Sequence, residues 1–202
     1  MITAKLFVAA ACAAVCALFA GGASATTITF SGLAGANGSP FSTYTEGGFT
    51  VTPTVGSWFQ GQVFGNPVPS IVAGGVFGGP AVDSISVTDG GKPFRFSALD
   101  FAPSPVNNVD FTFTGTLGGA PVFNIPGVLT PPQVFATVLS GVAADVIDDL
   151  VVGVTILNNT ANDSVNIDNI VVNPAATPEP MSLGLLATGL ALLGLAYRRR
   201  SG

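Results

Sequence analysis

The stretch Val109-Asp110-Phe111-Thr112-Phe113-Thr114 alternates between apolar and polar side chains without a break. Successive side chains of a β-strand point to opposite faces, so this pattern predicts a strand with one buried face and one wet face. The same alternation occurs over residues 27–30, 49–52 and 85–88. The chain therefore has the hydrophobic period of strands.

More strands are predicted by stretches rich in β-branched and aromatic residues at 94–98, 122–125, 134–139, 150–157 and 165–172. Glycine and proline clusters separate these stretches and mark turns. Residues 143–150 could form one helical turn. Many short strands joined by Gly/Pro turns predict an antiparallel β-sandwich or barrel, and we expect the last strand to return beside the first.

Residues 1–25 have the pattern of a secretory signal peptide. Lys5 precedes an apolar run, and the segment ends in the small residues Ala23-Ser24-Ala25, which form an A-x-A cleavage site. We expect this segment to form a signal helix, to direct export through the inner membrane, and to be cleaved after Ala25.

Residues 177–202 combine three features in order: Pro178-Glu179-Pro180, an uncharged apolar run over 181–197, and Arg198-Arg199-Arg200. As a helix the apolar run would rise about 26 Å, which is near the lower limit for crossing a bilayer core of about 30 Å. Arginines that follow such a span stay in the cytoplasm. The two prolines disfavour helix and keep the tripeptide extended outside the membrane.

This three-part tail resembles the sorting segment of PEP-CTERM proteins, which are exported and handled by membrane transpeptidases called exosortases. The resemblance implies an exosortase-like partner, a C-terminal transmembrane helix held only transiently in the inner membrane, and a final place in the cell envelope, on the outer surface or outside the cell. It also implies association with exopolysaccharide or biofilm matrix. The alternative is a plain C-terminal anchor with a proline-containing linker.

Between these segments, residues 26–176 are long enough for one domain with its own core. Only Lys92 and Arg95 are basic here, against ten acids, which gives a net charge of −8. Nucleic acid and anionic lipid need a basic face on their partner, so the charge argues against both. Cations and neutral polymers are the more natural partners.

Two stretches of this domain, Phe94-Arg95-Phe96-Ser97-Ala98-Leu99-Asp100 and Val165-Asn166-Ile167-Asp168-Asn169-Ile170-Val171-Val172, resemble the jelly-roll sandwiches of exported PEP-CTERM proteins and carbohydrate-binding modules. The resemblance implies an antiparallel, jelly-roll-like β-sandwich. It also implies a structural calcium ion between early and late strands, with Asp168 as a candidate ligand. The alternative is an acidic patch in contact with water, or an Asp168 side chain that points outward from a strand.

The residues available for catalysis are few. The chain has no histidine, and its two cysteines lie in the signal segment, so Ser-His-Asp and Cys-His nucleophiles and common zinc or copper sites are excluded. A carboxylate-dependent glycan hydrolase remains conceivable, with Asp83 and Asp89 or Asp100 and Asp110 as the acid pair. We favour a protein that is not an enzyme, with these acids in turns and on wet strand faces, because none is embedded in an aromatic-rich segment that would raise its pKa.

Sugar binding needs a flat aromatic face with amides or carboxylates nearby. Trp58, between glycines and beside Gln60, and Tyr44, in a loop-like stretch, are the candidate glycan contacts. The alternative for a lone tryptophan is a place in the core. The sequence thus predicts a non-catalytic glycan-binding or structural matrix protein, with a protein that binds no ligand and serves as bulk matrix as a further alternative.

Overall fold

The computed structural model describes residues 24–74, 81–103, 105–156 and 163–175. Within these ranges the regular structure consists of strands alone, which confirms the all-β class predicted from the alternating pattern. The strands are β1 (Thr26–Ile28), β2 (Tyr44–Glu46), β3 (Phe49–Val55), β4 (Trp58–Gly61), β5 (Ser70–Ala73), β6 (Ala81–Thr88), β7 (Phe94–Ala102), β8 (Val109–Leu117), β9 (Ala120–Leu129), β10 (Ala136–Leu139), β11 (Asp149–Ile156) and β12 (Val165–Pro174).

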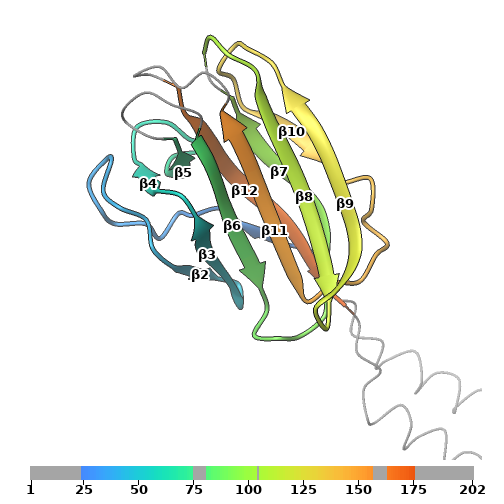
Figure 1. The fold of residues 1–202 in the computed structure, drawn as a ribbon. Helices are drawn as coiled ribbons and strands as arrows, with labels where there is room; N and C mark the ends of the chain where they lie inside the picture. The colour runs from blue at the N-terminus through green and yellow to red at the C-terminus, as the bar shows by residue number, and fades with distance from the viewer. Residues whose placement is uncertain (1–23, 75–80, 104, 157–162, 176–202) are drawn as a thin grey trace, which may run out of the picture. The chain divides into compact units, whose positions relative to one another are not determined.

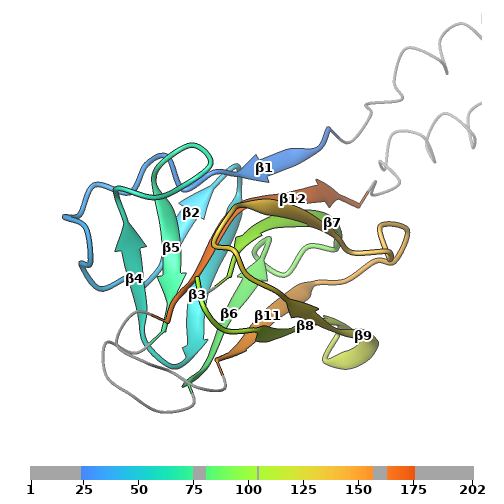
Figure 2. The same cartoon turned by 90° about the horizontal axis from the view of Figure 1, so that it is seen from above.

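The strands form two antiparallel sheets that pack face to face (Figures 1 and 2). Sheet A has the order β10-β7-β12-β5-β4, and β1 also pairs with β12. Sheet B has the order β2-β3-β6-β11-β8-β9. The predicted antiparallel, jelly-roll-like β-sandwich is therefore confirmed.

The first and last strands lie side by side. Thr26 pairs with Val172 and Ile28 pairs with Ile170, both in antiparallel register. The start of β1 and the end of β12 consequently lie at the same end of the sandwich. This pairing confirms the expectation that the last strand returns beside the first.

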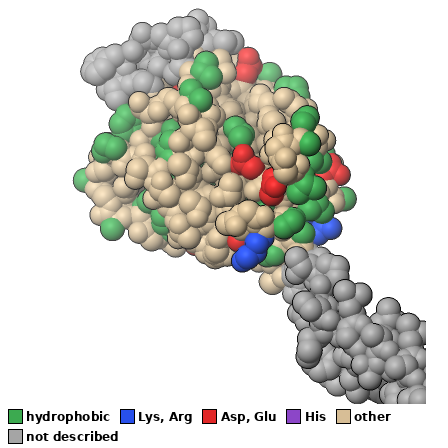
Figure 3. Space-filling view, turned by 60° about the horizontal axis from the view of Figure 1, so that its bottom comes forward, with side chains coloured by type: hydrophobic (Ala, Val, Ile, Leu, Met, Phe, Trp, Pro, Cys, Tyr) green, Lys and Arg blue, Asp and Glu red, His purple; other side chains and the backbone are tan. Residues whose placement is uncertain are grey.

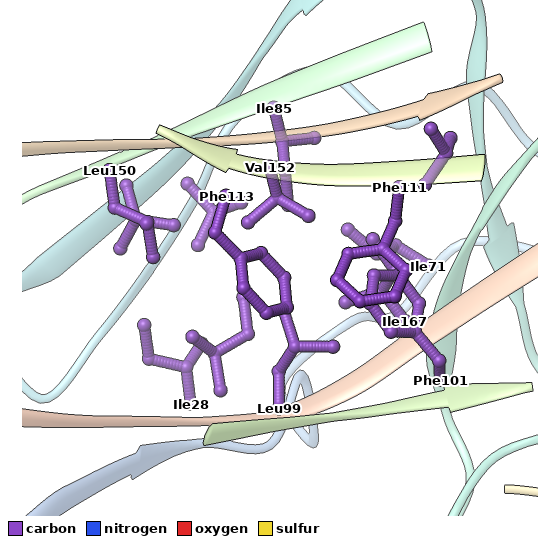
Figure 4. Packing of buried hydrophobic residues seen from close by; sticks show 14 of the residues in the cluster. Ile28, Ile71, Ile85, Leu99, Phe101, Phe111, Phe113, Leu150, Val152 and Ile167 are labelled. Atoms are coloured by element: carbon purple, nitrogen blue, oxygen red, sulfur yellow. The ribbon is translucent and has the colours of Figure 1, made fainter. Parts of the chain in front are cut away.

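Apolar side chains of both sheets meet in the core (Figure 4). The alternating stretch that predicted β8 places Phe111 and Phe113 on the inner face, where Phe113 makes an edge-to-face contact with Phe96 of β7 at 4.9 Å between ring centroids. Burial of one large apolar side chain stabilises a fold by about 1.5–3 kcal/mol, so this interior is the main source of stability.

Irregular pairing between β7 and β12 sends two acids to the outer face of sheet A. The register of this pair shifts between Asp168 and Val171, and Asn169 has a positive φ of 47°. The shift lets both Ile167 and Ile170 enter the core while Asp168 points away from it. Asp100, between core residues of β7, also faces outward and lies directly opposite Asp168.

Three strands were not predicted: β2, β4 and β5, of three, four and four residues. Each is too short to show a period, and a glycine follows β2 and β5 and ends β4, so the local pattern resembles a loop. Residues 143–150 contain a turn closed by a hydrogen bond from Asp145 N–H to Val142 O at 2.9 Å, and β11 begins at Asp149.

The signal segment up to Ala23 and the whole tail from residue 176 lie outside the described residues. Within the described ranges, no helix is long and apolar enough to cross a membrane. The predicted signal helix and transmembrane helix therefore stay predictions.

Candidate functional site

Trp58, a predicted glycan contact, is a core residue. Its side chain is 2% exposed, and its indole N–H donates to Val55 O at 3.2 Å. A ring with no free face cannot stack on a sugar. The structure gives this residue the core position that the sequence left as the alternative.

Tyr44, the other predicted glycan contact, holds the chain where it leaves β1. Its hydroxyl accepts from Gly32 N–H at 3.0 Å and donates to Glu46 Oε2 at 3.2 Å. The same Glu46 oxygen accepts the backbone N–H groups of Thr29 and Phe30, at 2.8 and 3.0 Å. Burial raises the pKa of the Tyr44 hydroxyl, and the Glu46 charge adds to the rise. The half-buried ring thus has a structural role.

The acid pairs considered for hydrolysis are not brought together. Asp100 points outward from sheet A and Asp110 points outward from sheet B, so the core of the sandwich lies between them. Asp83 lies in the first half of β6 and Asp89 follows its last residue, six positions away, or about 20 Å along an extended strand. Neither pair can flank one glycosidic bond.

Asp168 instead pairs with Asp100, a combination that the sequence did not suggest. The two are Cα partners on adjacent strands, and they are 0% and 7% exposed. Residues 62–69, which we call the strap, connect β4 to β5 and fold back over the outer face of sheet A as far as these two acids. The strap explains why two carboxylates on an outer face are buried.

Hydrogen-bond donors surround both carboxylates. Asp168 accepts from the backbone N–H of Asn66 at 2.7 Å and of Asn169 at 2.8 Å. Asp100 accepts from the Thr137 hydroxyl at 2.6 Å and from the side-chain amides of Asn169 and Asn66 at 2.9 and 3.2 Å. The Asn169 amide also donates to Asn66 O. Residues of β7, β10, β12 and the strap thereby form one polar layer.

The pKa of Asp168 is raised to about 6, mainly by burial and in addition by the charges of Asp100 and Glu46, against the opposing effect of the two backbone N–H donors. These neighbouring charges are both negative. Like charges directly opposite each other on a sheet repel, so the layer depends on its N–H and O–H donors for stability.

The polar layer does not fit the calcium ion implied by the resemblance. Calcium takes six to eight oxygen ligands, whereas N–H and O–H donors already point at all four carboxylate oxygens of Asp100 and Asp168. Among the described residues, no group of three or more acidic, histidine or cysteine side chains could hold a metal ion. Calcium at Asp168 stays a prediction, which titration with Ca²⁺ followed by thermal unfolding tests.

An aromatic pair flanks the polar layer. The rings of Phe64, in the strap, and Phe135, just before β10, are stacked with centroids 5.0 Å apart and planes 28° apart. Both side chains are half-buried. Phe64 lies two residues before Asn66, and Phe135 lies two residues before Thr137, so each ring is two positions in the chain from a side chain that binds Asp100. Aromatic surface next to amide and hydroxyl groups is what a sugar-binding site requires.

The sequence contains little that would have identified this site. Phe64 and Phe135 lie 71 positions apart, and the strap resembles an ordinary Gly/Pro loop. One local signal was present: phenylalanine two positions before a polar side chain occurs in both stretches. Only the pairing of β7 with both β10 and β12 brings the two stretches together.

Another buried acid lies in the opposite sheet. Asp83 of β6 is 3% exposed, and its Oδ1 accepts from Ser57 N–H at 2.9 Å, while Oδ2 has no hydrogen-bond partner of normal geometry among the described residues. Burial raises the pKa of Asp83, against the opposing effect of the Ser57 and Gly74 amides. Asp83 thus holds the turn between β3 and β4 at some cost in desolvation.

The sorting residues Pro178, Glu179 and Pro180 and the basic cluster Arg198 to Arg200 lie outside the described residues, as does Ala23 of the cleavage site. Ala25 is described and exposed, directly before β1. The cleavage and sorting assignments remain predictions.

No protein-family model and no curated protein sequence matches this chain. Among solved structures, it is similar to a mutant of the family 29 carbohydrate binding module CBM29-2, with a TM-score of 0.43 and 15% identity over 75% of this chain and 91% of the other. The family 32 module of C. perfringens NanJ in complex with galactose has a TM-score of 0.40, with 15% identity over 59% and 92%. TmCBM61 in complex with beta-1,4-galactotriose has a TM-score of 0.38, with 8% identity over 64% and 90%.

A bacteriophage CBA120 tailspike domain, described as enzymatically active, is also similar, with a TM-score of 0.39 and 13% identity over 64% of this chain and 20% of the other. At TM-scores below 0.5, none of these likenesses assigns a ligand or an activity to this chain. Support for the candidate site consequently comes from its own geometry.

Proposed function

We propose that this chain is an exported, non-catalytic surface or matrix protein whose sandwich binds a neutral polysaccharide at Phe64 and Phe135. The observation that carries the proposal is the stacked, half-buried pair of rings, each two positions in the chain from a polar side chain that binds Asp100: the amide of Asn66 and the hydroxyl of Thr137. Aromatic rings bind the apolar face of a sugar, and amides and hydroxyls take its hydroxyl groups.

The charge of the surface supports a neutral partner. The face in Figure 3 carries a few acidic and a few basic side chains in a surface that is mostly uncharged. Over residues 26–176 the acids outnumber the bases by ten to two. An anionic polymer would be repelled by such a domain, whereas a neutral polysaccharide meets no electrostatic barrier.

Retention on a panel of immobilised polysaccharides tests this proposal. We expect Phe135→Ala to weaken retention about tenfold or more, because a stacked aromatic contact is lost. Leu139→Ala is the matched control, since Leu139 is an exposed apolar side chain just beyond Phe135 in the chain. Equal retention of wild type and Phe135→Ala would contradict the site, and release of reducing sugars would contradict the non-catalytic role.

We further propose that an exosortase-like membrane transpeptidase processes the tail at Pro178-Glu179-Pro180. The support is the order of tripeptide, apolar run and arginines, together with the end of β12 at Pro174, which leaves the tripeptide just beyond the last strand. The C-terminal peptide of the mature protein, measured by mass spectrometry in cells that process such tails, decides the matter. Loss of Arg198 to Arg200 is expected, and their retention would favour a plain C-terminal anchor.

A further inference from the structure

The strap reaches much further across sheet A than its ends require. It connects β4 to β5, which are neighbours at one edge of the sheet. One tight hairpin turn could join such strands, yet Asn66 contacts Asp168 on β12 and Asp100 on β7, one and two strands beyond β5. The contacts at its middle therefore determine where the strap lies.

Those contacts all involve the polar layer. The Asn66 N–H group donates to Asp168 over a separation of 102 residues, and the Asn66 side chain donates to Asp100. Asn66 O in turn accepts from the side chain of Asn169. Closer to β5, the Ser70 hydroxyl donates to Phe64 O at 2.6 Å. On the other side of Phe64, the Gln62 N–H group donates to Asn37 Oδ1 at 2.9 Å and the Gln62 amide donates to Leu33 O at 3.1 Å. Phe64 is thus held by Ser70 and lies between the hydrogen bonds of Gln62 and those of Asn66.

We propose that Asp168 and Asp100 are the positioning residues of the polysaccharide site: they hold the strap, and with it Phe64, against Phe135 through N–H and O–H donors. This inference rests on the proposed function for its ligand. In this inference, direct hydrogen bonds connect the strands at Asp168, where the resemblance implied a calcium ion. Neither acid touches the sugar in this arrangement, because both are covered by the strap.

The chemistry of the layer explains why a carboxylate is needed at position 168. Two backbone N–H groups point at its two oxygens, 2.7 and 2.8 Å away. An asparagine there has one accepting oxygen and one NH₂ group, which faces a second donor and repels it. Asp168→Asn keeps the size of the side chain and removes one charge-assisted hydrogen bond, either to the strap or to Asn169.

Hydrogen exchange followed by mass spectrometry, on the full chain purified in a mild detergent, tests the inference. We expect Asp168→Asn to accelerate exchange in peptides covering residues 62–69 about 10- to 100-fold, the range that corresponds to loss of a hydrogen bond to a charged group. Peptides of β8 and β11, in the opposite sheet, should keep their protection. Polysaccharide affinity of the same variant should fall by at least tenfold.

Two further variants keep the result interpretable. Asp110→Asn removes a carboxylate from the outer face of sheet B and should leave strap exchange and affinity unchanged. Asn66→Ala removes only the side chain of an exposed strap residue, so we expect it to fold. It provides a second test of the strap contacts if Asp168→Asn does not fold. It should accelerate strap exchange several-fold, because the contact with Asp100 is lost.

Unchanged strap exchange in both Asp168→Asn and Asn66→Ala would overturn the inference. Faster strap exchange in wild type after treatment with EDTA would also overturn it, since a metal ion would then hold the strap. If strap exchange rises but wild type binds no polysaccharide, the hydrogen-bonded clamp is supported while the proposed function fails. If polysaccharide binds equally to wild type and Asp168→Asn, the site stands and the positioning role is overturned.

Discussion

Two glycines inside strands, Gly115 and Gly153, differ in the space available for an added side chain. A Cβ on Gly115, on the inner face of β8, would lie 2.5 Å from the ring of Phe123 and 2.7 Å from Ile147. A Cβ on Gly153, on the outer face of β11, would meet only Thr112 O at 3.9 Å. The ring of Phe123 therefore occupies the space that Gly115 leaves, while Gly153 has open space above it.

We expect Gly115→Ala to destabilise the protein by about 1–3 kcal/mol, because overpacking forces neighbouring side chains to move. Chemical denaturation monitored by tryptophan fluorescence measures the loss, since Trp58 is buried.

Gly153→Ala is the control for this substitution. It should be neutral or raise stability by up to about 1 kcal/mol, because alanine loses less backbone entropy than glycine on folding. Equal effects of the two substitutions would show that Phe123 is not fixed against β8.

At the scale of elements, β10 is an edge strand that lacks the usual features that prevent pairing with another chain. It pairs only with β7, contains no charged residue and no proline, and carries Leu139, which is 76% exposed. Val134, just before it, is 61% exposed. An apolar edge with free backbone groups invites pairing with another chain.

Leu139→Lys should therefore reduce self-association without loss of stability. The side chain lies in solvent, so its replacement costs little, and a charge on an edge strand disfavours pairing. Light scattering during concentration or heating measures the effect. Unchanged aggregation together with an unchanged unfolding midpoint would show that self-association begins elsewhere.

At the scale of the whole molecule, the buried acids make stability depend on pH. The pKa of Asp168 is raised to about 6 and that of Asp83 is raised as well, in both cases mainly by burial. The folded state therefore binds protons more tightly than the unfolded state. The stabilisation from Asp168 is complete below about pH 4 and is lost as the pH rises through about 6.

Urea unfolding of wild type between pH 4 and pH 7.5 should show a higher midpoint on the acidic side of this range. Asp168→Asn should flatten the dependence between about pH 4 and 6, whereas Asp110→Asn should preserve it. A midpoint that falls on acidification from pH 6 to pH 4 would mean that paired carboxylates elsewhere outweigh Asp168 and Asp83.

The sequence by itself determined the fold class, most of the strands and the return of the last strand to the first. Alternating stretches such as residues 109–114 are sufficient for this, because the side-chain period of a strand is a local property. Local reasoning left Trp58 open between a glycan contact and a core position, and packing against distant strands places it in the core. Tyr44 is half-buried, and its role as a glycan contact stays a prediction.

Only the tertiary structure decided the site. Asp100 and Asp168 lie 68 positions apart and Phe64 and Phe135 lie 71 apart, and the one local signal, a phenylalanine two positions before a polar side chain, does not show which stretches pair. The order β10-β7-β12-β5 and the register shift beside Asp168 bring them together under the strap. The physical reason is that strand order and register depend on contacts across the whole core, which no short stretch of sequence contains.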